Sequence, residues 1–178
     1  AVNSADEIFM VYVSYKSPFS LVMKKKAWAD ASWPAAPDTI AKGDNGITKP
    51  YIGIDDNDHI YVVFRRDNAA DTKYGMEEIV YVTSADDGAT WSQPVRLSRE
   101  NYDAGYVTLA PKIRSTGVDV LWRESYRQFL DDADTTAIVY GHIDLVGTAI
   151  DDEGPGVISN FTLQQNYPNP FNPTTTID

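Results

Sequence analysis

Four charged residues have the type and spacing to contribute to a ligand-binding site. Arg65 and Arg66 come just after one apolar segment that ends in an aromatic residue, and Arg123 and Glu124 come just after another. The guanidinium group presents a fork of N–H donors that matches a carboxylate. An arginine that recurs in register past an aromatic residue could therefore line one end of a channel and bind an anionic sugar. The alternative, which is the common fate of charges near strand ends, is a ladder of surface salt bridges.

Other residue combinations that could take part in catalysis or metal binding are weaker candidates. Tyr126 lies two residues after Glu124, but adjacency in a loop is weak support for a nucleophile pair. Asp55-Asp56-Asn57-Asp58 lacks the Gly and the terminal Glu of a regular calcium loop, and a solvated turn is the better interpretation. The same holds for Asp131-Asp132-Ala133-Asp134. His59 and His142 are isolated, so we predict no metal site and no cofactor, and we assign no catalytic residue.

The composition excludes several classes of protein. Fifteen Lys and Arg against 26 Asp and Glu give the 178 residues a net charge of -11. Such a surface repels phosphate, and the only cationic run, Lys24-Lys25-Lys26, is expected at a solvated strand edge, so we expect no nucleic-acid partner. There is no cysteine for disulfides or thiolate metal sites. No apolar run reaches the ~20 residues that span a bilayer, so we expect no transmembrane segment.

The elements that must position these residues recur along the chain. Ile79-Val80-Tyr81 corresponds to Leu21-Val22-Met23 and to Ile138-Val139-Tyr140, at offsets of 58 and 59 residues. Gly53–Phe64 matches Ala1–Tyr12 without a gap. Each copy consists of four short segments rich in Val, Ile, Tyr and Trp, separated by Asp, Asn and Gly, which is typical of strands and turns.

Four strands per repeat predict an all-β chain built of β-propeller blades. We expect about three four-stranded repeats, at residues 1–47, 48–108 and 109–147, with Pro111-Lys112-Ile113 opening the third. A β-sandwich of similar strands is the alternative. Because three blades leave sheet edges open, the propeller is predicted to be incomplete, with further blades from chain outside this sequence or from other subunits.

One motif in the second repeat is sharply defined. Ser84-Ala85-Asp86-Asp87-Gly88-Ala89-Thr90-Trp91 fits the pattern Ser-x-Asp-x-Gly-x-Thr-Trp. An Asp in a turn can accept hydrogen bonds from downstream N–H groups, and Gly permits a positive φ. The motif resembles the Asp-box (BNR repeat) of sialidase-family propellers, and the resemblance implies a structural role on the side away from the ligand. The motif positions are Ser84, Asp86, Gly88, Thr90 and Trp91.

The resemblance to sialidases also implies what an active member would contain. Enzymes of the family use three arginines around the substrate carboxylate, a Tyr–Glu nucleophile pair and an Asp acid/base. None of these roles can be assigned to a residue of this chain. The sequence therefore leans against an enzyme in this stretch.

The composition changes at the C-terminal end of the chain. Residues 148–160 read as an acidic Gly/Pro linker. Residues 161–178 resemble the start of the C-terminal sorting domain of type IX secretion substrates, a β-sandwich of which only the first strand would be present. That resemblance implies recognition by the secretion machinery and a location outside a bacterium or on its outer-membrane surface. The motif residues are Asn166, Tyr167, Pro168, Asn169, Pro170, Phe171, Asn172 and Pro173.

Together these features predict a secreted or cell-surface sialidase-like propeller that binds carbohydrate or another surface polymer. The first alternative is an exo-acting, sialidase-type glycoside hydrolase whose catalytic residues lie outside this sequence. The second is a structural component of an extracellular layer or filament. Fold alone does not choose among them.

Overall fold

The described part of the chain is entirely β-structure. The computed structural model describes residues 1–15, 19–42, 46–68, 75–100, 102–110, 117–126 and 135–143, and these ranges contain ten strands and no helix. No helix within them could therefore cross a membrane. The linker at 148–160 and the sorting motif at 161–178 lie outside the described residues. The prediction of an all-β chain is confirmed.

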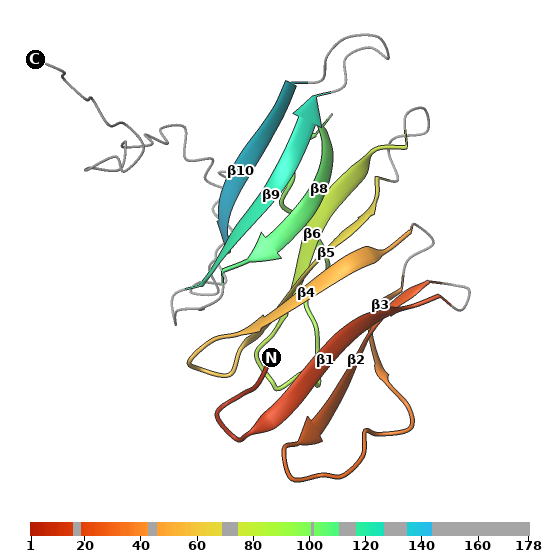
Figure 1. The fold of residues 1–178 in the computed structure, drawn as a ribbon, viewed down its shortest axis with the longest axis vertical. Helices are drawn as coiled ribbons and strands as arrows, with labels where there is room; N and C mark the ends of the chain where they lie inside the picture. The colour runs from red at the N-terminus through yellow and green to blue at the C-terminus, as the bar shows by residue number, and fades with distance from the viewer. Residues whose placement is uncertain are drawn as a thin grey trace, which may run out of the picture.

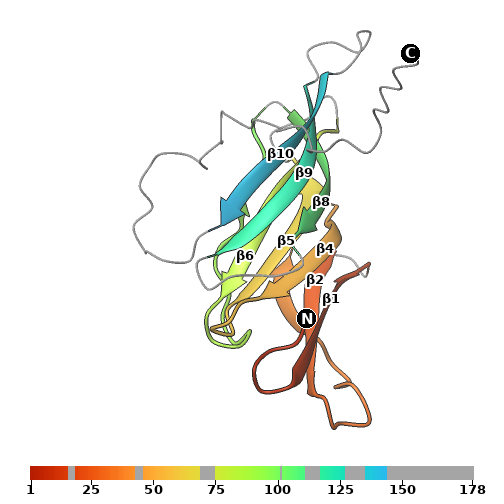
Figure 2. The same cartoon turned by 60° about the vertical axis from the view of Figure 1, so that its left-hand side comes forward.

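The strands form three antiparallel sheets (Figure 1). The first sheet has the order β1-β2-β3, the second β4-β5-β6-β7 and the third β10-β9-β8. Figure 2 shows the same three sheets from another side. The strand bounds are β1 Glu7–Ser14, β2 Ser20–Ala27, β3 Asp38–Lys42, β4 Thr48–Ile54, β5 Ile60–Asp67, β6 Glu77–Ser84, β7 Val95–Arg96, β8 Tyr102–Leu109, β9 Val118–Tyr126 and β10 Thr135–Ile143.

The second sheet lies between the other two, and β5 shows this most directly. The five residues Ile60 to Phe64 are all at most 1% exposed. Side chains alternate between the faces of a strand, so Ile60, Val62 and Phe64 pack with Phe9 and other residues of the first sheet. Tyr61 and Val63 pack instead with residues of the third sheet, such as Trp122. A continuous apolar run is the expected sequence of a strand that is covered on both faces.

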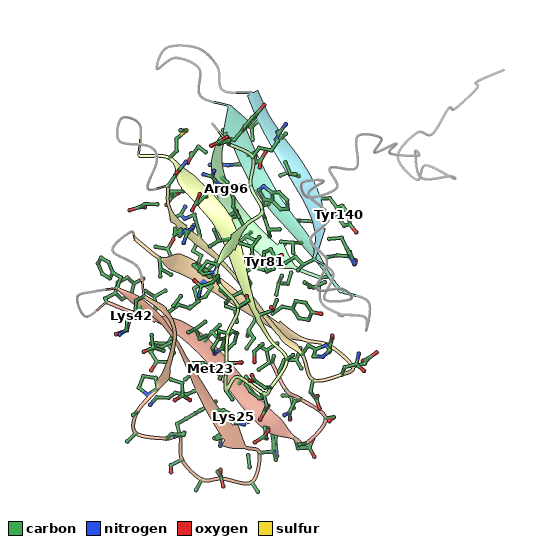
Figure 3. The ribbon with its side chains drawn as sticks, turned by 180° about the vertical axis from the view of Figure 1, so that it is seen from behind. Met23, Lys25, Lys42, Tyr81, Arg96 and Tyr140 are labelled. Carbon is green, nitrogen blue, oxygen red and sulfur yellow. The ribbon has the colours of Figure 1, made fainter. Side chains whose placement is uncertain are left out.

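The two apolar layers on either side of the second sheet are separate clusters. Figure 3 labels Met23 on β2 and Tyr81 on β6. Met23 belongs to the layer between the first and second sheets. Tyr81 packs against the layer between the second and third sheets. Burying an apolar side chain of this size contributes about 1.5–3 kcal/mol, so face-to-face packing of the sheets is the main source of stability.

A turn repeats in the first two copies, atom for atom. Asn3 Oδ1 accepts hydrogen bonds from the amides of Ala5 (3.1 Å) and Glu7 (2.9 Å). Asp55 Oδ1 accepts the equivalent bonds from Asn57 and His59, both at 2.9 Å. The residue three positions on has a left-handed backbone in each turn, with φ of 60° at Asp6 and 61° at Asp58. The gapless match of residues 1–12 with 53–64 therefore corresponds to one conformation.

The turn between β6 and β7 is held by Asp86. Its Oδ1 accepts the Thr90 amide (2.8 Å) and the Ser84 hydroxyl (2.8 Å), and its Oδ2 accepts the Thr90 hydroxyl (2.5 Å). These hydrogen bonds, of which those from Thr90 have the largest effect, lower the pKa of Asp86 to about 2. Gly88 has φ of 85°. A Cβ added at Gly88 would lie only 2.5 Å from the Met23 Cε. Trp91 packs against the layer between the first and second sheets.

Lys24-Lys25-Lys26 lies in the part of β2 that pairs with β1 alone, because the pairing of β2 with β3 ends at Met23. The structure differs from the sequence-based expectations in two other places. Only the second sheet has four strands among the described residues. The third repeat was expected to begin with Pro111-Lys112-Ile113. The first strand of the third sheet is instead β8, which ends at Leu109, before that segment. That segment lies outside the described residues, and the division into blades stays a prediction.

The hydrogen bonds of Asp86 generate a prediction for stability against pH. Because the folded-state pKa of Asp86 is lowered from 3.8 to about 2, the charged carboxylate stabilises the fold above pH ~4, and this contribution is lost as the pH falls through about 2. Asp86→Asn should therefore melt below the wild type at pH 6, with the gap closing between pH 4 and pH 2. Thermal melts followed by circular dichroism at several pH values measure this gap.

The control for this experiment is Asp56→Asn, at an exposed turn position of the same chain. Its melting temperature should follow that of the wild type at every pH. An Asp86→Asn gap that stays constant down to pH 2 would show that the charge of Asp86 is not what stabilises the turn.

Candidate functional site

The end of the sheets opposite the Asp86 turn carries a cluster of cations. Because β4 pairs antiparallel with β5, and β8 with β9, the first residues of β4 and β8 and the last residues of β5 and β9 lie at this end. We call Lys49, Arg65, Tyr106 and Arg123, which lie there, the cationic cluster. Its members come from the second and third sheets, so their proximity depends on the packing of those sheets.

Arg65 and Arg123 occupy equivalent positions in their sheets. Arg65 on β5 pairs in register with Thr48 on β4, and Arg123 on β9 pairs with Gly105 on β8. Gly105 has no side chain, and a Cβ there would lie 3.8 Å from both Arg65 Nη1 and Arg123 Nη2. Two guanidinium groups thus converge beside one glycine.

A β-bulge follows each of these pairs. The register shifts between Thr48 and Tyr51 on β4, and between Gly105 and Thr108 on β8. The residue at the bulge has a left-handed backbone in both strands, with φ of 50° at Lys49 and 54° at Tyr106. Bulges redirect side chains and are common beside functional sites. A left-handed backbone is costly for residues other than glycine.

The two bulges place Lys49 and Tyr106 in contact. Lys49 Nζ lies 4.7 Å from the centroid of the Tyr106 ring, and Arg123 Cζ lies at the same distance from it. The electron-rich face of an aromatic ring attracts cations. Tyr106 is nevertheless 64% exposed, so much of its surface is open to a ligand.

The charges within this region are unevenly paired. Arg65 donates from Nε to Thr48 Oγ1 (2.9 Å) and forms an ion pair with Glu77 through Nη1 (2.5 Å). Within the described residues, neither Lys49 nor Arg123 forms an ion pair, and the buried Nε of Arg123 has no hydrogen-bond partner. Burial raises the pKa of Glu77, and the nearby Asp103 adds to this while Arg65 and Lys49 oppose it. The acidic groups therefore gather around Glu77, and unpaired positive charge lies at Tyr106.

The four charged candidates from the sequence divide into two groups. Arg66 and Glu124 follow Arg65 and Arg123 by one residue, so they point to the other face of each strand. Arg66 forms an ion pair with Glu78 (2.6 Å), which also binds Arg96 (2.5 Å). This is the salt-bridge ladder that was the alternative interpretation for such charges, and no open cluster forms around Arg66.

Glu124 is enclosed by donors of the protein itself. It is completely buried, and its Oε1 accepts Trp122 Nε1 (2.9 Å) and the Arg99 amide (2.8 Å). Its Oε2 pairs with Arg99 Nε (2.6 Å). These contacts give Glu124 a structural role between β9 and the segment that follows β7. The side chain of Tyr126, its possible partner, lies outside the described residues.

Asp55 also differs from its expected environment. It is buried rather than solvated, and besides the two amides it contacts His59 Nδ1 (3.0 Å) and Tyr61 Oη (3.1 Å). Its carboxylate is thus used by the turn. Among the residues that the structure describes, no cluster of His, Asp and Glu could hold a metal ion. The segment 131–134 lies outside them.

Sequence reasoning missed Lys49, Glu77, Tyr106 and a polar group on the third sheet. In that group Tyr140 Oη (2.6 Å) and His142 Nδ1 (2.7 Å) both contact Asp119 Oδ1. A glycine inside a strand pattern often marks a bulge, so Gly105 was the one signal that could have pointed to Tyr106. Nothing in the sequence marks Lys49 as having a positive φ.

A cavity of about 480 Å³ lies between β2, β3 and the Asp86 turn. Its charged lining is already engaged, since Lys25 forms ion pairs with Asp87 and Glu7. Asp87 is also within reach of Asn3 Nδ2 (3.4 Å). These contacts link the first sheet to the second, so we assign the cavity a structural role and no ligand.

Comparison with known proteins bears on the fold. No family model and no curated protein matches the chain. Among solved structures, it is similar to the Hadza microbial sialidase Hz136, with a TM-score of 0.53 and 12% sequence identity. The chain has a sialidase-like β fold. The match covers 78% of this chain but 33% of that protein, and at such identity it establishes the fold and no activity.

The burial of Glu124 generates a prediction that separates structure from binding. Glu124→Ala should lower the free energy of unfolding by about 2 kcal/mol or more, because it leaves the indole N–H and the Arg99 amide without an acceptor. Arg66→Ala, at a partly exposed pair, should change it by less than about 1 kcal/mol. Urea denaturation of both variants measures this difference. A Glu124→Ala protein as stable as the wild type would contradict the structural role.

Proposed function

We propose that the protein is a secreted or cell-surface, sialidase-like propeller protein that binds an acidic carbohydrate at the cationic cluster. The observation that carries this proposal is the convergence of Arg65 and Arg123 from equivalent positions of two sheets. They meet beside Gly105, which has no side chain to lie between them. Arginine pairs are suited to carboxylates because their N–H groups are fixed in a fork.

The charge distribution supports the same ligand class. The chain as a whole has a net charge of -11, yet Lys49 and Arg123 form no ion pair among the described residues. An acidic sugar would supply the negative charge that Arg123 lacks among the described residues, through the forked N–H donors of its guanidinium group.

Two further parts of the proposal rest on sequence patterns. The Asp86 turn, at the end away from the cluster, is the Asp-box of a sialidase-like blade, and its role is structural. The motif at 166–173 directs the protein to the type IX secretion machinery and so to the outside of the cell. Both are supported by the match of specified residues to their motifs.

The enzymatic alternative is an exo-acting hydrolase of the sialidase type. It is favoured by the similarity in fold to a sialidase, of which this chain spans a third. In that case the catalytic residues would be shared with blades outside this sequence. Hydrolysis of a fluorogenic sialoside by the protein would favour this alternative, whereas we expect binding without turnover.

The binding proposal is tested with Arg123→Ala. Arg123 has no ion pair to break within the described residues, so the substitution should leave the melting temperature nearly unchanged. Affinity for an acidic oligosaccharide, tetragalacturonate, should fall about tenfold or more by isothermal titration calorimetry, since a hydrogen bond to a charged group contributes about 1.5–3 kcal/mol.

The matched control is Arg66→Ala, one residue past Arg65 but on the opposite face, which should bind as the wild type does. Equal affinity of the wild type for tetragalacturonate and for neutral maltotetraose would overturn the assignment to an acidic ligand. Unchanged affinity in Arg123→Ala would contradict ligand binding at the cluster and favour the interpretation of its charges as surface salt bridges.

A further inference from the structure

We propose that Lys49 and Tyr106 form a second subsite beside Arg65 and Arg123, so that the cluster takes a glycan chain with acidic groups on neighbouring sugars. A single terminal acidic sugar would then be the weaker ligand. This inference rests on the proposed function, because it specifies which acidic carbohydrates the same cluster prefers.

The first support is the repetition of a strained bulge. In both β4 and β8 the residue after the Arg-paired position has a positive φ. The residues there are Lys49 and Tyr106, although glycine would adopt the same backbone at no steric cost. Strained backbone that persists at non-glycine residues is concentrated at functional sites. The strain here has a visible result, because it brings the ammonium group of Lys49 over the ring of Tyr106.

The second support is the count of unpaired cations. Arg65 is already paired with Glu77, so it contributes little free charge. Lys49 and Arg123 both lie at the Tyr106 ring, 4.7 Å from its centroid, and within the described ranges neither forms an ion pair, although Lys49 is close enough to Glu77 to lower its pKa. Two unpaired positive charges close to one ring repel each other. A ligand with two acidic groups neutralises both, whereas a ligand with one leaves a net positive charge.

The third support is the surface between the two cations. Tyr106 is 64% exposed, and a tyrosine combines an apolar ring with a polar hydroxyl. Such a ring can pack against the C–H face of a sugar while the acidic groups of adjacent units reach the cations. A chain of uronic acids has this alternation of apolar ring faces and carboxylates along its length.

The experiment compares galacturonic acid with its tetramer by isothermal titration calorimetry. The wild type should bind tetragalacturonate at least tenfold more tightly than the monomer, which corresponds to about 1.4 kcal/mol. Lys49→Gly removes the ammonium group but keeps a residue that accepts φ of 50°, so it should fold and melt no lower than the wild type. Its affinity for the tetramer should fall about tenfold, whereas its affinity for the monomer should fall much less. Lys49→Arg should retain tight binding of the tetramer.

The outcomes separate this inference from the proposed function. If the wild type binds neither the monomer nor the tetramer, the proposed function itself fails. If it binds both, but with equal affinity, the second subsite is overturned and the acidic-sugar site stands. A Lys49→Gly protein that keeps the full affinity for the tetramer overturns the subsite in the same way.

Discussion

The burial of β5 on both faces is the constraint on which the rest of the structure depends. Five successive residues from Ile60 to Phe64 have almost no exposed surface, and they supply apolar side chains to both clusters of the core. A strand of this kind is stable only when one sheet covers each face. The first and third sheets therefore have to pack against the second, and that packing decides where the polar residues at the strand ends meet.

The two ends of the sheets use polar residues in opposite ways. At the end with the Asp86 turn, carboxylates such as Asp55 and Asp86 accept several hydrogen bonds from their own turns, and Lys25 ties two sheets together. Polar groups there are satisfied within the protein. At the other end Lys49 and Arg123 have cation–π contacts with Tyr106 and form no ion pair among the described residues. Satisfied groups stabilise the fold, whereas unpaired groups are available to a ligand.

Neighbouring residues on a strand have different roles because their side chains alternate between faces. Arg65 and Arg123 lie in the cationic cluster, where Arg65 also pairs with Glu77, whereas Arg66 and Glu124 form ion pairs on the opposite face of their strands. Within the described strands, the non-glycine residues with a left-handed backbone are Lys49 on β4 and Tyr106 on β8, whereas Asp6, Asp58 and Asp87 have it in turns at the other end. In a sialidase-like fold, neighbouring positions on one strand can thus differ in their partners, and the fold by itself does not determine the ligand.

The sequence by itself determined the strands, the repeat and the equivalence of Arg65 with Arg123. These are properties of local pattern: apolar runs favour strands, and the gapless match of residues 1–12 with 53–64 fixes one turn conformation. Only the tertiary structure decided that Glu124 is buried, that β2 is a central strand, and that Lys49 and Tyr106 meet. Burial depends on which sheet covers a strand, and a positive φ at Lys or Tyr is imposed by the neighbouring strand against the preference of the residue itself.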